Sequence, residues 1–207
     1  MITGDVFFRR VFKPLVFLSA LLPFAIMLRG AWVGDLGANP LETVTHGTGD
    51  WALRFLLLTL AMTPLRRLLH RSWPLRMRRM LGLYAFFYAS LHFLIWLVLD
   101  QELSWHNILG DIAKRPYITV GFTAWLLLVP LAATSTRWAM RRLGRRWTRL
   151  HRLVYPIAVL AVVHYLWLVK ADLFEPLLYG AILAVLLLAR LRLPHGLRLR
   201  ATPPVSP

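Results

Sequence analysis

The sequence contains no cysteine and very little negative charge. Without cysteine the chain cannot form disulfides, thiolate metal sites or cysteine-ligated iron–sulfur clusters, which leaves histidine as the credible soft metal ligand. Only 9 of the 207 residues are acidic, against 25 lysines and arginines, and charged residues make up 16% of the chain. Because about a quarter of the residues of a typical soluble domain are charged, this composition disfavours a soluble protein.

Hydrophobic sequence dominates instead, at 58% of the residues with a mean hydropathy of +0.57. The apolar residues form blocks, several of which reach the roughly 17–25 residues needed to cross a bilayer. We therefore predict an all-α fold, a polytopic membrane helix bundle of six transmembrane helices. The predicted spans are 12–28, 51–65, 81–99, 117–133, 153–169 and 176–190. The second, fourth and sixth are short and would need flanking residues or local thinning of the bilayer.

Basic and acidic residues occupy alternate connections between these blocks. The N-terminal segment, the second and fourth connections and the C-terminal tail hold all the basic residues except Arg29, Arg54, Lys114, Arg115 and Lys170. Asp5 is the one acidic residue in those segments. By the positive-inside rule, both termini are expected in the cytoplasm. The net charge of +16 is thus interpreted as a topology signal and not as a nucleic-acid-binding surface. No small-residue cleavage site follows the first block, so we expect it to be a retained span.

Two histidines lie at matching depth in the predicted bundle. His92 is about 12 residues from the cytoplasmic end of the third span, and His164 is equally far into the fifth, which places both ~18 Å deep. Ionisable side chains inside hydrocarbon are costly and usually functional, and imidazole is a common axial ligand of haem iron. The two rings could therefore hold one b-type haem in the outer half of the bilayer. The alternative, that each is a hydrogen-bonded packing residue, stays open on the pattern alone.

His151 and Arg54 are less certain candidates. His151 lies at the cytoplasmic boundary, ~20 Å from His164, and would point to another side of a straight helix unless Pro156 bends it. It could be a ligand or an interfacial residue among arginines. Arg54, near the outer start of the second span, could extend to the interface or pair with a haem propionate. The remaining histidines fall in loops or at span ends, where we expect them to be solvated: His46, His70, His106 and His195.

Four long segments resemble a known family. They are NPLETVTHGTGDWALRFLLLTLAMTPLRRL (39–68), RRMLGLYAFFYASLHFLIWLVLD (78–100), KRPYITVGFTAWLLLVPLAATST (114–136) and RRLGRRWTRLHRLVYPIAVLAVVHYLWLVKAD (141–172). They resemble the MsrQ (YedZ) family of haem-binding membrane subunits, within the ferric reductase-like transmembrane domain superfamily. The resemblance covers about residues 10–192. We therefore expect a ferric reductase-like transmembrane haem domain over 1–192 and a disordered cytoplasmic tail over 193–207.

The resemblance implies specific cofactors and partners. It implies haem b and a bound FMN in a multi-pass protein of the bacterial inner membrane, delivering electrons to a periplasmic molybdopterin subunit (MsrP) that reduces oxidised methionines. In the superfamily two helices each carry two haem-ligating histidines. The fifth span keeps that pair as His151 and His164, whereas the third keeps only His92, with Arg78 and Arg79 where the inner partner would be. His151 is thus left as an alternative ligand, a flavin neighbour or a quinol-site residue.

The chain is expected to transfer electrons and not to catalyse sulfoxide reduction itself. It has no G-x-G-x-x-G motif after a strand, and the TGD at 48–50 is too short to form a phosphate loop. Its electrons must then come from membrane quinol or from a separate cytosolic flavin reductase. Two other hypotheses remain: a stand-alone quinol-dependent ferric or cupric reductase, and a structural membrane anchor with no cofactor.

Overall fold

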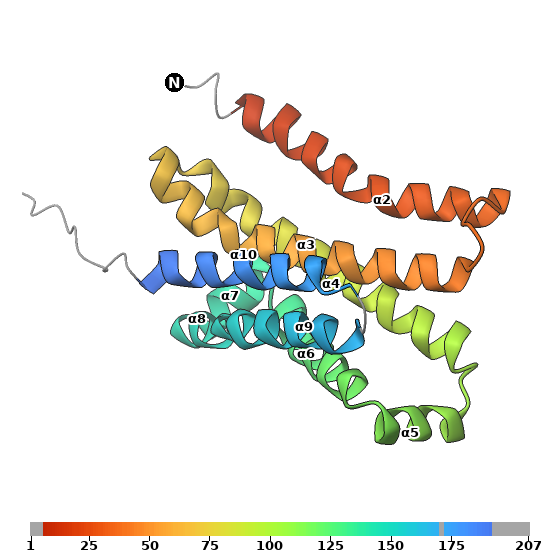
Figure 1. The fold of residues 1–207 in the computed structure, drawn as a ribbon. Helices are drawn as coiled ribbons and strands as arrows, with labels where there is room; N and C mark the ends of the chain where they lie inside the picture. Colours follow the sequence, from red (N-terminus) through yellow and green to blue (C-terminus); the bar gives the residue numbers. More distant parts are fainter. Residues whose placement is uncertain (1–5, 170–171, 192–207) are drawn as a thin grey trace, which may run out of the picture.

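The computed structural model describes residues 6–169 and 172–191, and every regular element within these ranges is helical (Figure 1). The expected all-α class is therefore confirmed for the described residues, and the expected tail at 193–207 lies outside them. The long helices are α2 (Lys13–Val33), α3 (Pro40–Leu69), α4 (Trp73–Ile95), α6 (Pro116–Ala133), α9 (Val154–Leu168) and α10 (Phe174–Leu191). The shorter elements are η1 (Phe8–Phe12), η2 (Trp96–Asp100), α5 (Trp105–Lys114), α7 (Arg137–Leu143), α8 (Arg145–Leu150) and η3 (His151–Leu153).

Within the described residues, four helical stretches are long and apolar enough to cross a membrane. They are Phe8–Val33, Trp73–Asp100, Pro116–Ala133 and Arg145–Leu168. These stretches contain the first, third and fourth predicted spans and all but the last residue of the fifth. The second and sixth predicted spans lie within α3 and α10. The structure thus supports a membrane bundle, and the number six stays a prediction.

The prediction of a short second helix was wrong, because α3 is 30 residues long. Asn39 accepts a long hydrogen bond from the backbone N–H of Glu42 (3.4 Å) and donates from its side-chain amide to the Glu42 carboxylate (2.8 Å). Pro40 at the first position completes a favourable helix start. The first turns of α3 are too polar for a hydropathy pattern to detect. They carry Thr45 and Gly49, which prove important below.

The two ends of the bundle carry opposite charge, as the alternation in sequence predicts. We call the basic end the one formed by the α3–α4 connection, α7, α8 and the last turn of α10, on the left of Figure 1. The acidic end, toward the right, comprises the α2–α3 connection with the N-terminal part of α3, the segment from η2 through α5, and the start of α10 with the residues that lead into it. All the acidic residues of the described chain belong to it: Asp35, Glu42, Asp50, Asp100, Glu102, Asp111, Asp172 and Glu175.

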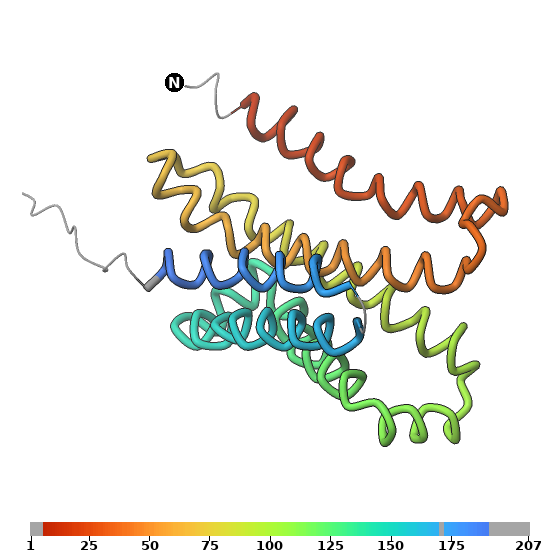
Figure 2. Tube along the Cα trace, in the orientation of Figure 1, coloured from red at the N-terminus to blue at the C-terminus, as the bar shows by residue number. Residues whose placement is uncertain are grey.

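The core is formed where α3 and α4 pack against each other and against α9. Figure 2 shows α2 on one side of the α3–α4 pair, with α6 and α9 on the other. Phe55 of α3 stacks on Tyr84 and Tyr88 of α4, with ring centroids 5.4 and 5.5 Å apart. Tyr88 and Ile157 are fully buried. Lipid tails are as apolar as the helix surfaces, so the hydrophobic effect alone does not drive these helices together. Aromatic stacking adds directional packing that stabilises the contact.

Helix α2 is attached to the bundle through tyrosine hydroxyls. The Tyr88 hydroxyl donates to the carbonyl of Ala20 (2.8 Å) and accepts from the N–H of Phe24 (3.1 Å), two groups that are helix partners at i and i+4. The Tyr84 hydroxyl donates to the carbonyl of Phe17 (2.8 Å). Pro23 lies within this turn and interrupts the backbone ladder. The hydroxyls of Tyr84 and Tyr88 therefore form hydrogen bonds with backbone groups of α2 that lipid hydrocarbon could not form.

The tyrosine contacts predict that removing the Tyr88 hydroxyl markedly lowers the stability of the fold. Tyr88→Phe removes a buried hydroxyl with two backbone partners and should lower the free energy of unfolding by about 1–3 kcal/mol. Tyr84→Phe, which loses one such bond, should cost less. Thermal unfolding of both variants in the same detergent measures the difference. Equal stability of wild type and Tyr88→Phe would contradict this account of how α2 is held.

Candidate functional site

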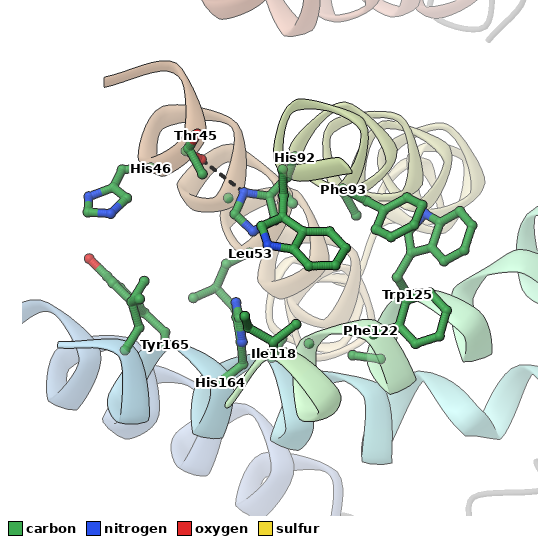
Figure 3. Close-up of a pocket in the computed structure, with 18 of the residues that line it drawn as sticks. Thr45, His46, Leu53, His92, Phe93, Ile118, Phe122, Trp125, His164 and Tyr165 are labelled. Atoms are coloured by element: carbon green, nitrogen blue, oxygen red, sulfur yellow. Dashed lines mark hydrogen bonds between the residues drawn. The ribbon is translucent and has the colours of Figure 1, made fainter. Parts of the chain in front are cut away.

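A cavity of about 440 Å³ opens near the acidic end, between α3, α4, α6 and α9. Its volume falls in the range typical of ligand-binding pockets. Most of its walls are apolar, and His92 and His164 approach each other across it from α4 and α9 (Figure 3). His46 and Tyr165 lie on one side and Phe93, Phe122 and Trp125 on the other, as Figure 3 shows. The two histidines predicted to lie at equal depth are thus brought together.

The His92 ring is fixed by the neighbouring helix α3. Its Nδ1 lies 2.9 Å from the backbone carbonyl of Thr45, which can only accept, so Nδ1 carries the proton. One turn later on α3, Gly49 faces the same ring; a Cβ at that position would lie 3.2 Å from the imidazole. The carbonyl therefore sets the tautomer of His92, and the glycine makes room for its ring.

The His164 ring is fixed in the same way by α6. Its Nδ1 lies 2.7 Å from the backbone carbonyl of Tyr117. A Cβ at Gly121, one turn further along α6, would lie only 2.7 Å from the ring, closer than real Cβ contacts allow. Glycine is therefore required here by the close approach of the imidazole, while its φ angle is ordinary for a helix.

The two halves of the site share one construction. In each, the histidine follows its carbonyl partner by 47 residues, and the glycine lies four residues after the carbonyl. Both rings consequently present an unprotonated Nε2 as the free donor atom. The ring centroids of His92 and His164 are 6.1 Å apart, with the planes at 79°. Two such nitrogens facing one cavity can serve as a pair of metal ligands.

Aromatic side chains form one wall of the cavity. Phe93 stacks on Trp125 at 4.4 Å between centroids, and the Trp125 indole N–H donates to Ser90 (3.1 Å). Trp96, in the π-helical turn η2 after α4, also lines the cavity, and its indole nitrogen is buried with no hydrogen-bond partner. A buried donor of this kind is suited to a polar group of a ligand. Sequence reasoning did not identify Trp96.

His151 lies at the opposite, basic end of the bundle. It begins the 3₁₀ turn η3 and stacks on Trp147 with 3.8 Å between centroids. Its Nδ1 is 3.1 Å from the Trp147 carbonyl, four residues earlier in the chain, and its Nε2 is buried without a partner. The structure therefore separates His151 from the pair formed by His92 and His164.

Arg54 has partners of its own, one of which, Asp50, lines the cavity. Its Nε donates to the Tyr179 hydroxyl (2.8 Å), its guanidinium lies 3.6 Å from the Asp50 carboxylate, and it packs over the Trp51 ring at 5.0 Å. Arg54 is not among the residues that line the cavity. Its expected contact with a haem propionate stays a prediction. His46 is exposed as expected, although it lies within α3 and at the cavity edge instead of in a loop.

The donor set limits the kind of metal that this site can hold. Within the described chain, no group of three or more histidine or carboxylate side chains is positioned to bind an ion. Two histidines alone leave most coordination positions of a transition metal unfilled, so the other ligands must come from a cofactor. The arrangement thus suits a macrocycle-bound metal better than a bare ion.

Known proteins match most of the chain. The family described as ferric reductase like transmembrane component matches residues 48–162, which include Gly49, His92 and Gly121. The protein-methionine-sulfoxide reductase heme-binding subunit MsrQ of Xanthomonas euvesicatoria pv. vesicatoria (strain 85-10) is 58% identical over 181 residues, 84% of this chain and 83% of that protein. The subunits of the same name from Xanthomonas oryzae pv. oryzae (strain MAFF 311018) and Herminiimonas arsenicoxydans are 56% identical over 183 residues and 52% over 181. In each case the match covers 86% of this chain, and 84% and 83% of the two relatives, respectively. Similarity of this extent shows that the chain belongs to the MsrQ family and contains a ferric reductase-like transmembrane domain.

Proposed function

We propose that this chain is a haem b-containing electron-transfer subunit of the bacterial inner membrane. In this proposal it passes electrons from quinol or a flavin reductase to a periplasmic molybdopterin methionine sulfoxide reductase (MsrP), and so supports repair of oxidised periplasmic proteins. The observation that carries the proposal is the cavity between His92 and His164, where each Nδ1 is occupied by a carbonyl and each Nε2 is free. The names of the relatives, which specify heme binding, support the same cofactor.

The separation of the two rings fits ligation of one iron atom. A metal–imidazole bond is about 2 Å long and the ring centre lies about 1 Å behind the nitrogen, so two rings on opposite sides of one ion have centres roughly 6 Å apart. The observed 6.1 Å between the centroids of His92 and His164 agrees with this value. In this proposal His92 and His164 would hold the haem iron.

The protein contributes orientation and exclusion of water. Haem, when bound, supplies reversible one-electron chemistry at its iron. The Thr45 and Tyr117 carbonyls hold both imidazoles in the ligating tautomer and increase their basicity. The apolar walls, including Leu53 and Phe93, keep the site dry. The free indole N–H of Trp96 is placed to donate to a polar group of the cofactor.

The charge asymmetry gives the proposed direction of transfer. With the basic end in the cytoplasm, both termini are cytoplasmic and the cavity lies toward the periplasm. The donor would then act from the membrane or the cytoplasmic side, and MsrP would dock on the acidic end. FMN, implied by the resemblance, remains part of the proposal. We assign no residues to it, because the described chain shows no glycine-rich phosphate loop.

Absorption spectra provide the first test of the ligand assignment. Purified wild-type protein should show a low-spin haem, and His92→Ala and His164→Ala should each abolish it because one of the two histidines that would hold the iron is lost. His151→Ala should retain the low-spin spectrum, since His151 lies at the other end of the bundle. Pyridine haemochrome measurement gives the haem content per mole of protein for each variant. A colourless wild-type preparation from haem-replete cells would instead support a structural anchor.

The two glycines provide a graded test of the site's construction. Gly121→Ala would place a Cβ 2.7 Å from the His164 ring, whereas Gly49→Ala would place one 3.2 Å from His92. We expect Gly121→Ala to lose haem and to be destabilised by about 1–3 kcal/mol, and Gly49→Ala to show a weaker effect. Gly110→Ala is the control, because nothing lies within 4 Å of a Cβ there. Haem occupancy and thermal unfolding measure both effects, and equal occupancy in all three variants would refute the role of the glycines.

Electron transfer itself tests the proposed function. Reconstituted protein supplied with reduced quinol, or with a cytosolic flavin reductase and its reductant, should support sulfoxide reduction only when MsrP is present. The activity should fall to background in His164→Ala. If the chain reduces chelated ferric or cupric ions as fast without MsrP, the stand-alone reductase becomes the better description.

A further inference from the structure

Buried polar atoms without partners gather at the basic end of the bundle. Within the described chain five such side-chain atoms occur, and one of them, the Trp96 indole nitrogen, belongs to the cavity already described. The other four are Thr63 Oγ1, Arg67 Nη1, His151 Nε2 and Arg190 Nε. Buried polar groups are normally hydrogen-bonded, so a cluster of unpartnered ones points to a ligand. Three of these four side chains, those of Arg67, His151 and Arg190, are guanidinium or imidazole groups, so the ligand expected here is an anion.

These groups lie on helices that contact one another. Arg190 of α10 donates to the backbone carbonyl of Leu60 on α3 (2.5 Å) and to the Tyr155 hydroxyl of α9 (2.7 Å). Thr63 and Arg67 follow Leu60 at helical spacing and lie on the same face of α3. Contacts from α10 thus bring the basic end of α3 and the start of α9 to one place.

Among the residues that the structure describes, the cluster holds positive charge without a carboxylate to balance it. Arg78 of α4 is partly buried and close enough to both Arg190 and His151 for the charges to act on one another. Every acidic residue of the described chain lies at the acidic end, so none neutralises these arginines. Like charges held together inside a membrane protein repel, and a bound anion would relieve that repulsion.

An apolar groove lies directly beside this charge. It runs between the end of α3 and α10 and is lined by Ala61, Pro64, Leu65, Leu68 and Leu186, with Arg67 and His70 at its polar side. Leu68 is 77% exposed, so the groove faces the bilayer. Among the described residues the apolar lining is aliphatic, with no phenyl or indole ring on which a flavin could stack. An aliphatic groove next to a guanidinium matches the two parts of a phospholipid.

We propose that the basic end binds the phosphate of an anionic phospholipid, with an acyl chain lying in the groove between α3 and α10. Guanidinium groups bind phosphate oxygens with two parallel hydrogen bonds, and Arg67 has a free donor for this purpose. Basic pockets between transmembrane helices on the cytoplasmic side are general sites for anionic headgroups. The lipid fills the groove and compensates the charges of Arg67, Arg78 and Arg190.

The test uses the full-length, haem-loaded protein in nanodiscs of phosphatidylcholine with a rising fraction of phosphatidylglycerol. Retained lipid is measured by mass spectrometry after extraction, and the thermal midpoint is measured at each composition. Wild type should retain phosphatidylglycerol in preference to phosphatidylcholine and should unfold at a higher temperature when it is present. Arg67→Gln should weaken this preference about fivefold, and Arg67→Lys should restore part of it.

Arg66→Gln is the matched control, because it removes the same charge from the adjacent, exposed position of α3. It should leave the preference within about twofold of wild type. An equal loss in Arg66→Gln and Arg67→Gln would overturn the proposal in favour of general surface attraction, as would a wild type with no preference. Loss of FMN, with lipid retention unchanged, in Arg67→Gln would assign the site to the flavin and refute lipid binding. Haem content, measured in parallel, separates these outcomes from any failure of the haem site.

Discussion

A hydrogen bond from an imidazole Nδ1 to a backbone carbonyl of the neighbouring helix sets the arrangement of both halves of the site. In hydrocarbon no water is present to accept a hydrogen bond from the imidazole N–H. The bonds of His92 to Thr45 and of His164 to Tyr117 therefore fix the register of the helices as well as the orientation of the rings. Each bond works only if the helices approach closely, and Gly49 and Gly121 permit that approach. The rings are thus ordered by the protein itself, so a ligand that binds between them loses little free energy in ordering them.

The regular rise of a helix and the apolar blocks predicted that His92 and His164 lie at matching depth, and the structure brings their rings together at one cavity. The sequence could not reveal the glycines, since their role depends on which helices are neighbours. Gly49 even lies in the TGD tripeptide, which was too short to interpret. The first turns of α3 were missed because capping by Asn39, and not hydrophobicity, begins that helix. The contact between Arg54 and Tyr179 joins residues 125 positions apart, beyond the reach of local patterns.

His151 illustrates why sequence position alone does not define a ligand. Its Nδ1 interacts with the carbonyl of Trp147, four residues earlier in its own chain segment, and its ring stacks on the same residue. The other two histidines are fixed by a different helix. The environment of His151 is one of positive charge beside Arg78. The two ends of the molecule thus differ in chemistry: one holds a mainly apolar cavity with two similarly oriented histidines, and the other a basic cluster that lacks carboxylates within the described chain.

The attachment of α2 has a consequence for the lipid around the protein. Tyr84 and Tyr88 bind backbone groups one turn apart on α2, close to Pro23, so the helix cannot slide along α4 without losing three hydrogen bonds. Many membrane helices adapt to a thinner or thicker bilayer by shifting or tilting. Here that freedom is absent at the level of Ala20, and the outward side chains of α2, such as Leu18 and Leu22, are exposed at a fixed height. In a membrane of unsuitable thickness, the lipid and not the helix would have to deform.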